Sequence, residues 1–250
     1  MSKLITIVVA SSIGAIIGFT FVNQERIETT TDQNKTLLIK ITDRETQKTS
    51  PATIEDFKWP GPKKDHDTEF ILNGTNKTST IKSLTTVAGK PISELETQMR
   101  PGASGPSGST AGFLGRNESL LEVLANDNKV VVEENGLTHQ QLAAPLLILT
   151  QLRKDNKSGM LKFGKNVFYI ANFKSSNGFQ HSPFGDELKS SEEFTIFNPE
   201  TKQKLHYSTL VPEMIYRYGF YEGQGTKFRV PPEKIIEFFG KELIKGIALP

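Results

Sequence analysis

Hydrophobic positions fall into three kinds of segment along the chain. Short runs rich in β-branched and aromatic residues predict strands, and apolar residues that recur every three or four positions predict helices. The third kind is one long apolar stretch near the amino terminus. The predicted strands lie near residues 36–42, 68–72, 80–87, 129–133, 160–164, 167–173, 192–197, 204–209 and 226–230, and the predicted helices near 117–126, 138–152, 211–218 and 232–240.

Two pairs of these strands are close enough in sequence to form hairpins. Strands 160–164 and 167–173 flank a short turn, and strands 192–197 and 204–209 flank a longer one. Hairpin strands are antiparallel, and no regular alternation of strand and helix runs through the chain. The pattern therefore predicts an α+β fold with a mixed, largely antiparallel sheet and packed helices, of which the 138–152 helix is central.

The start of that central helix has a specific sequence pattern. Thr138 and Gln141 have the spacing of a capping box, in which each side chain accepts a hydrogen bond from the other residue's backbone N–H. The following residues are apolar nearly all round the helix. We therefore expect the helix to be buried, with Pro145 inside it.

The long apolar stretch covers Leu4–Val22, which contains 19 residues without a charge. A helix of this length matches the hydrocarbon core of a bilayer, about 30 Å. Lys3 precedes it and acidic residues follow, so the amino terminus is expected in the cytoplasm and the remainder outside. We favour a retained signal-anchor; cleavage after Thr20 would instead give a secreted protein.

Within this segment, Gly14 and Gly18 form a G-x-x-x-G motif. Small residues at this spacing allow two membrane helices to approach closely, which indicates a possible dimer. They are also common in any membrane helix, so the motif leaves both interpretations open.

Composition shifts divide the rest of the chain. After the anchor at 1–22, residues 23–35 are a polar tether and residues 36–98 are expected to form a small β-rich lobe. Residues 99–112 are rich in Gly, Ser and Pro and are a candidate hinge. Residues 113–250 are expected to form the main α+β domain.

Charge and composition exclude several classes of function. The chain has 30 Lys and Arg against 28 Asp and Glu, a formal net charge of +2, and the charges are evenly spread. No basic stripe exists to neutralise a row of phosphates, so nucleic-acid binding is not expected. Cysteine is absent, which excludes disulfides and thiolate metal sites. No metal site is predicted, and the cofactor stays unknown.

The segment 100–116 is a candidate anion site. It contains five glycines and two prolines, and it leads into the predicted helix at 117–126. Free backbone N–H groups before a helix can hold an anion. The polar side chains that would assist are Arg100, Ser104, Ser107 and Arg116. The segment lacks the lysine of a Walker A loop, and a flexible linker explains the same composition.

Two histidines and two carboxylates are candidates for catalysis. His139 lies in the first turn of the central helix, where the helix dipole favours a neutral imidazole that can act as a base. His181 and Asp186 share a long polar segment, and Glu222 lies between aromatic residues of the kind that can line a saccharide or peptide groove. A surface position, a solvated loop and core aromatics are the alternative explanations of these patterns, and each is the more common one.

Two hypotheses about function follow. The first is a non-catalytic, single-pass, membrane-anchored extracytoplasmic domain that binds an envelope or extracellular partner, either a protein or a saccharide. The second is a surface hydrolase or transferase that uses His139 and His181 with Asp186 or Glu222. The second hypothesis requires these side chains to converge in the fold.

Overall fold

The computed structural model describes residues 28–31, 37–42, 49–53, 59–60, 77–155, 160–163, 166–247 and 249. Over this part of the chain the fold is α+β with antiparallel sheets, as predicted. In the same part, no helix is both long and apolar enough to cross a membrane. The predicted membrane segment at 4–22 and the predicted strand at 68–72 lie outside the described residues.

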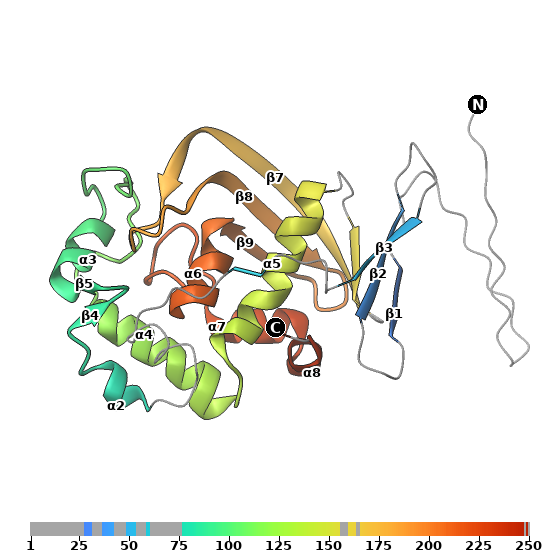
Figure 1. Ribbon diagram of the computed structural model, residues 1–250, viewed down its shortest axis with the longest axis horizontal. Helices are drawn as coiled ribbons and strands as arrows, with labels where there is room; N and C mark the ends of the chain where they lie inside the picture. Colours follow the sequence, from blue (N-terminus) through green and yellow to red (C-terminus); the bar gives the residue numbers. More distant parts are fainter. Residues whose placement is uncertain are drawn as a thin grey trace, which may run out of the picture.

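The main sheet has four antiparallel strands in the order β6-β7-β8-β9 (Figure 1). The strands are β6 (Met160–Phe163), β7 (Asn166–His181), β8 (Lys189–Asn198) and β9 (Gln203–Ser208). Sequential strands pair throughout, which confirms both predicted hairpins.

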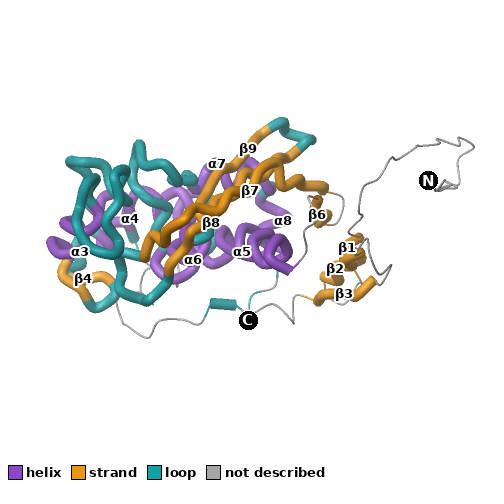
Figure 2. The backbone as a smooth tube through the Cα atoms, turned by 90° about the horizontal axis from the view of Figure 1, so that it is seen from above, coloured by secondary structure: helices purple, strands orange, loops and turns teal. Residues whose placement is uncertain are grey.

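One face of this sheet is buried because side chains alternate along each strand. In the pairing of β8 with β9, Phe194 lies opposite Tyr207 and Ile196 opposite Leu205, and all four are at most 3% exposed. The helices lie together on one side of the sheet (Figure 2). The apolar side chains of the two layers form the core.

Four predicted helices are confirmed, with shifts of a few residues at their ends. These are α4 (Leu120–Asn128), α5 (His139–Asp155), α6 (Leu210–Tyr218) and α7 (Pro232–Phe239). A further helix, α8 (Lys241–Gly246), was not predicted.

The capping box of α5 is also confirmed. Gln141 Oε1 accepts the Thr138 N–H at 2.9 Å, and Thr138 Oγ1 accepts the Gln141 N–H at 3.1 Å. The residues that follow on α5 are buried from Leu142 to Thr150. The helix is therefore the central buried element that its sequence predicts.

Residues 77–99 contribute short elements to the same core. They are α2 (Thr78–Ile81), β4 (Thr86–Val87), β5 (Lys90–Pro91) and α3 (Ile92–Met99). The prediction of a single strand at 80–87 is wrong, because its apolar residues are divided between a helical turn and a two-residue strand. Ile81, Val87, Leu95 and Met99 are nevertheless buried with the helices and the sheet.

A separate three-stranded antiparallel sheet precedes these elements. It consists of β1 (Glu28–Thr31), β2 (Leu37–Thr42) and β3 (Thr49–Thr53). The central strand, β2, confirms the predicted strand at 36–42.

Two further strand predictions are wrong. Residues 129–133 are part of η2 (Lys129–Glu134), a π-helical segment that continues α4. Of its three consecutive valines, only Val131 is fully buried. Residues 226–230 form turns and irregular chain, because Arg229 is held by contacts to α4 and to its own segment.

Candidate functional site

A buried ion pair joins α4 to the segment that connects α6 with α7. Asp127, near the end of α4, accepts two hydrogen bonds from the Arg229 guanidinium, at 2.6 Å and 3.1 Å. The side chains are only 4% and 11% exposed. Burial outweighs the attraction of Arg229 and raises the pKa of Asp127 to about 6. A helix and a distant loop are thus held together by a charged contact inside the protein.

Arg229 also fixes the turn that contains Glu222. Its guanidinium donates a hydrogen bond to the Glu222 carbonyl, and Glu222 has a positive φ of 66°. Glu222 is 1% exposed, and the polar groups of Thr226 and Phe228 near its carboxyl lower its pKa by less than burial raises it. Burial without a cation of its own raises its pKa to about 8, so the carboxyl is mostly protonated at neutral pH.

His139 lies in the same buried region and is completely shielded from solvent. Its Nδ1 is 2.9 Å from the Tyr221 hydroxyl, and its Nε2 is 3.2 Å from Asn128 Oδ1. Burial lowers its pKa to about 3, so the ring is neutral. The sequence predicted a neutral ring, but the physical cause is loss of hydration and not the helix dipole. Both ring nitrogens are already partnered within the protein.

Two of the four predicted catalytic residues, His139 and Glu222, are therefore brought into one buried region. Tyr221 connects them, since its hydroxyl contacts His139 and its backbone continues directly into Glu222. The aromatic residues around Glu222 belong to the core and do not line a groove. Tyr216, Tyr218, Phe220 and Tyr221 are at most 3% exposed.

The other two catalytic candidates lie elsewhere. His181 ends β7, where it pairs with Lys189 and its backbone N–H donates to the Pro106 carbonyl. The Asp186 carboxylate accepts hydrogen bonds from the Tyr218 hydroxyl at 2.7 Å and from the Leu188 N–H at 3.2 Å. Among the described contacts, none joins either residue to His139 or Glu222.

The predicted anion segment makes most of its polar contacts within the protein. Arg100 donates to the Gly115 carbonyl at 2.5 Å and lies 3.4 Å from a carboxylate oxygen of Glu96. Ser104 and Arg116 are exposed, and Ser107 is half-buried. The role of these four residues in binding an anion stays a prediction.

Glu118 joins the loop before α4, which contains Gly115, to the loop that contains Gln224. Its carboxylate accepts the Gly115 N–H at 2.6 Å and the Gln224 N–H at 2.8 Å. The approach is close enough that a Cβ on Gly223 would overlap this carboxylate and press on the Leu114 backbone. Glycine is required at 223 because the backbones pass in contact.

An open pocket of about 340 Å³ lies between α4 and the loop that contains Gln224. One wall is the outer face of α4 and the residues just before it, including Glu122, Val123 and Asn126. Gln224 forms part of the opposite wall, and Arg229, only 11% exposed, also lines the pocket. The ion pair of Arg229 with Asp127 and the bridge through Glu118 join the two walls of the pocket.

Sequence reasoning missed the residues that build this pocket. Asn126 and Asp127 precede a valine run that was assigned to a strand, and Arg229 was placed in another predicted strand. Glu118 lies in the predicted helix at 117–126, and its sequence position gives no sign of the bridge that it forms. A pairing between positions 127 and 229 has no local pattern, because the two residues are 102 positions apart.

No group of three or more His, Asp or Glu residues in the described part of the chain is arranged to hold a metal ion. No protein-family model, no curated protein and no solved structure matches the chain.

Proposed function

We propose that the chain is a single-pass, membrane-anchored domain that binds an envelope or extracellular ligand outside the cytoplasm without transforming it. The anchor is residues 4–22, and the binding site is the pocket between α4 and the segment from Gly219 to Pro231. The observation that carries the proposal is this pocket, which is lined mostly by polar residues and is large enough for a small ligand.

The buried histidine supports binding over catalysis. A general base must reach the proton that it removes from a substrate. His139 is fully buried, and its two ring nitrogens contact Asn128 and Tyr221. With a pKa of about 3 it also stays neutral at any physiological pH.

A hydrolase remains the second candidate because of Glu222. A carboxyl with a pKa of about 8 is protonated near neutral pH, as a general acid must be. It is 1% exposed, so the turn from Glu222 to Thr226 would have to move before a substrate could reach it.

The binding proposal is tested by a ligand screen on the full chain in detergent. Thermal unfolding is followed with a library of sugars, amino acids, nucleotides and small amines. The variants Asn126→Ala and Gln224→Ala remove pocket side chains, and in Gln224→Ala the backbone bond to Glu118 is kept. The control Asn177→Ala changes an exposed amide on β7, two residues from Phe179.

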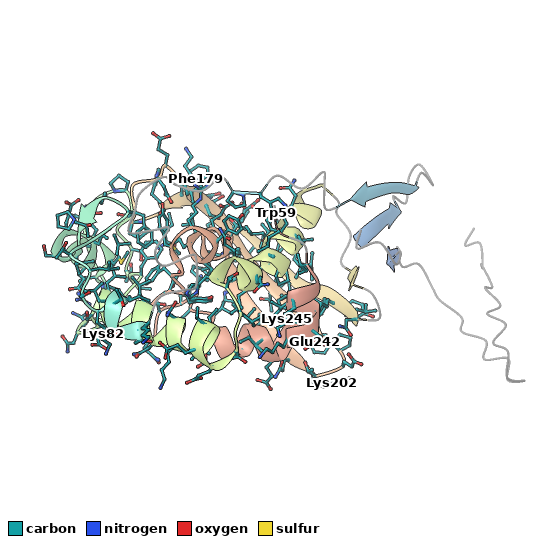
Figure 3. All side chains as sticks on the ribbon, turned by 60° about the horizontal axis from the view of Figure 1, so that its bottom comes forward. Trp59, Lys82, Phe179, Lys202, Glu242 and Lys245 are labelled. Carbon is teal, nitrogen blue, oxygen red and sulfur yellow. The ribbon has the colours of Figure 1, made fainter. Side chains whose placement is uncertain are left out.

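In Figure 3, Phe179, two residues from the control position, lies at the top of the molecule, whereas Lys82, which pairs with Glu122 at the pocket, lies at its lower left. At least one compound is expected to raise the unfolding temperature of the wild type and of Asn177→Ala, and less that of the pocket variants. A compound that stabilises all four proteins equally, or a library without a hit, contradicts the proposal. Conversion of a bound compound, detected by mass spectrometry, favours the hydrolase.

The topology is tested separately with introduced cysteines, since the chain has none of its own. Asn177→Cys is expected to react with a membrane-impermeant maleimide on intact cells, whereas Ser2→Cys is expected to react only after lysis. The opposite labelling pattern contradicts the proposed orientation.

A further inference from the structure

The charged groups that line the pocket already have partners within the protein, although those of Glu118 are neutral. Arg229 is neutralised by Asp127 at 2.6 Å, and Glu122 lies 2.6 Å from Lys82. The carboxylate of Glu118 accepts two backbone N–H groups. Among the described residues Arg229 is the one cation that lines the pocket, and its two terminal nitrogens are bonded to Asp127 and to the Glu222 carbonyl, whereas its buried Nε has no partner. Asp127 thus already neutralises the charge that an anionic ligand would need.

The first backbone N–H of α4 is also bonded within the protein. The Leu120 N–H donates to Glu96 Oε1 at 2.7 Å, and the Val123 N–H donates to the Ser119 carbonyl at 3.0 Å. The anion that a helix start could attract is already supplied by the carboxylate of Glu96. A phosphate or carboxylate ligand would be repelled by Glu96 and Glu118 as it approached.

The side chains that remain free for a ligand are neutral and polar. Asn117, Asn126 and Gln224 each offer an amide that both donates and accepts hydrogen bonds, and Ser119 adds a hydroxyl. Val123 supplies an apolar contact on the α4 face. Sugar hydroxyls both donate and accept hydrogen bonds, and sugar rings carry C–H groups that pack on apolar side chains.

We infer that the pocket binds an uncharged saccharide, one or two rings in size. This inference rests on the proposed function and specifies its ligand class. The volume of about 340 Å³ lies at the small end of the range for ligand pockets, which is about 300–1,000 Å³, and suits a short stretch of sugar chain.

Three disaccharides of similar size and different charge test the inference. They are N,N′-diacetylchitobiose, which is neutral, chitobiose, which carries two amines, and digalacturonate, which carries two carboxylates. Affinities are measured by titration calorimetry on the full chain in detergent, with cellobiose as a second neutral probe. The proteins are the wild type, Asn126→Ala, Gln224→Ala and the control Asn177→Ala.

At least one neutral disaccharide is expected to bind about tenfold more tightly than either charged one, and each pocket variant is expected to weaken it about tenfold. Asn177→Ala is expected to bind like the wild type. If digalacturonate or chitobiose binds more tightly than the neutral disaccharides and the pocket variants lose this binding, the inference that the ligand is uncharged is wrong, but the proposed site stands. Binding that neither pocket variant changes overturns the site itself, and absence of binding by both neutral probes overturns the inference.

Discussion

Residues 227 and 229 each form an ion pair, and the two pairs have the same length but differ in how far they are buried. Lys227 Nζ lies 2.6 Å from Glu193 Oε2, and Arg229 lies 2.6 Å from Asp127. The side chain of Lys227 is 53% exposed, whereas that of Arg229 is 11% exposed. The first pair is at the surface only on its lysine side, since the side chain of Glu193 is itself 11% exposed, whereas both partners of the second pair are buried beside the pocket.

The pKa of the carboxylate shifts in opposite directions in the two pairs. The hydrogen bond from Lys227, with smaller contributions from His206 and Lys174, lowers the pKa of Glu193. Burial raises the pKa of Asp127 to about 6 in spite of Arg229. Distance alone therefore does not decide what an ion pair contributes, because the cost of removing the charges from water differs between the two sites.

The largest expected effect comes from breaking the buried pair. Arg229→Met leaves Asp127 buried without a cation and removes the bond to the Glu222 carbonyl, which is expected to cost about 3–5 kcal/mol of stability at pH 7. Urea unfolding of the full chain, followed by tryptophan fluorescence, measures the change. Trp59 stacks on Tyr216 of α6, so it reports on the folded core.

If Arg229→Met does not fold, the double variant Asp127→Asn/Arg229→Met provides the comparison. It removes both charges and is expected to recover much of the loss, since a neutral pair has no unpaired charge to bury. A cost below about 1 kcal/mol for the single variant would show that the pair behaves like a surface pair.

The second effect is a dependence of stability on pH caused by Glu222. Its pKa is about 8 in the folded protein and 4.5 when exposed, so its contribution is fully present below pH 4.5 and is lost as the pH rises to 8. Between pH 6.5 and 8 this one proton gives a slope of up to about 1.4 kcal/mol per pH unit. Glu222→Gln is expected to flatten the slope in urea unfolding series.

The window above pH 6.5 isolates Glu222 from the other buried groups. His139 has the opposite sign, because its lowered pKa removes stability as the pH falls from 6.5 towards 3. Asp127 affects stability between pH 3.8 and about pH 6. Its raised pKa stabilises the folded protein at the acid end of this range, and this contribution is lost as the pH rises. An unchanged slope in Glu222→Gln above pH 6.5 would mean that another group titrates there.

The third effect is smaller and concerns the neutral part of the buried region. Tyr221→Phe removes the hydroxyl that lies 2.9 Å from His139 Nδ1 and leaves this nitrogen without a partner. The expected cost is about 1–2 kcal/mol, from thermal and urea unfolding at pH 7. A variant as stable as the wild type would show that water replaces the hydroxyl.

The smallest effect is expected at the surface pair. Lys227→Met removes the charge and keeps the side-chain stem, so it matches Arg229→Met two residues away. The expected cost is about 0–1 kcal/mol, and it should decrease further when salt is added. A loss as large as that of Arg229→Met would contradict the distinction between the two pairs.

Local patterns predicted the parts of the fold that depend on neighbouring residues. The capping box of Thr138 and Gln141, the two hairpins and the four longer helices were all visible in the sequence. The valine run at 130–132 was wrongly assigned to a strand, because packing against the core overrode the β propensity of these residues. The end of β7 was taken for a loop, since its side chains are mostly polar, apart from the exposed Phe179, and the strand is recognised only by its backbone pairing with β8.

The candidate site was predicted only in part. His139 and Glu222 drew attention for their local surroundings, and both lie in the buried region behind the pocket. Arg229 and Asp127 were missed, because an ion pair across 102 residues depends on how α4 meets a distant loop. Gly223 shows the same limit, since only the fold reveals that Glu118 occupies the space of its missing Cβ.

The central claim is that the pocket beside α4 is the ligand site, and amide NMR tests it most directly. The side-chain amides of Asn117, Asn126 and Gln224 are followed in the ¹⁵N-labelled full chain while diacetylchitobiose is added. We predict that these three signals shift together and saturate, while that of Asn177 does not move. Shifts confined to β7, or elsewhere away from these three amides, would contradict the account.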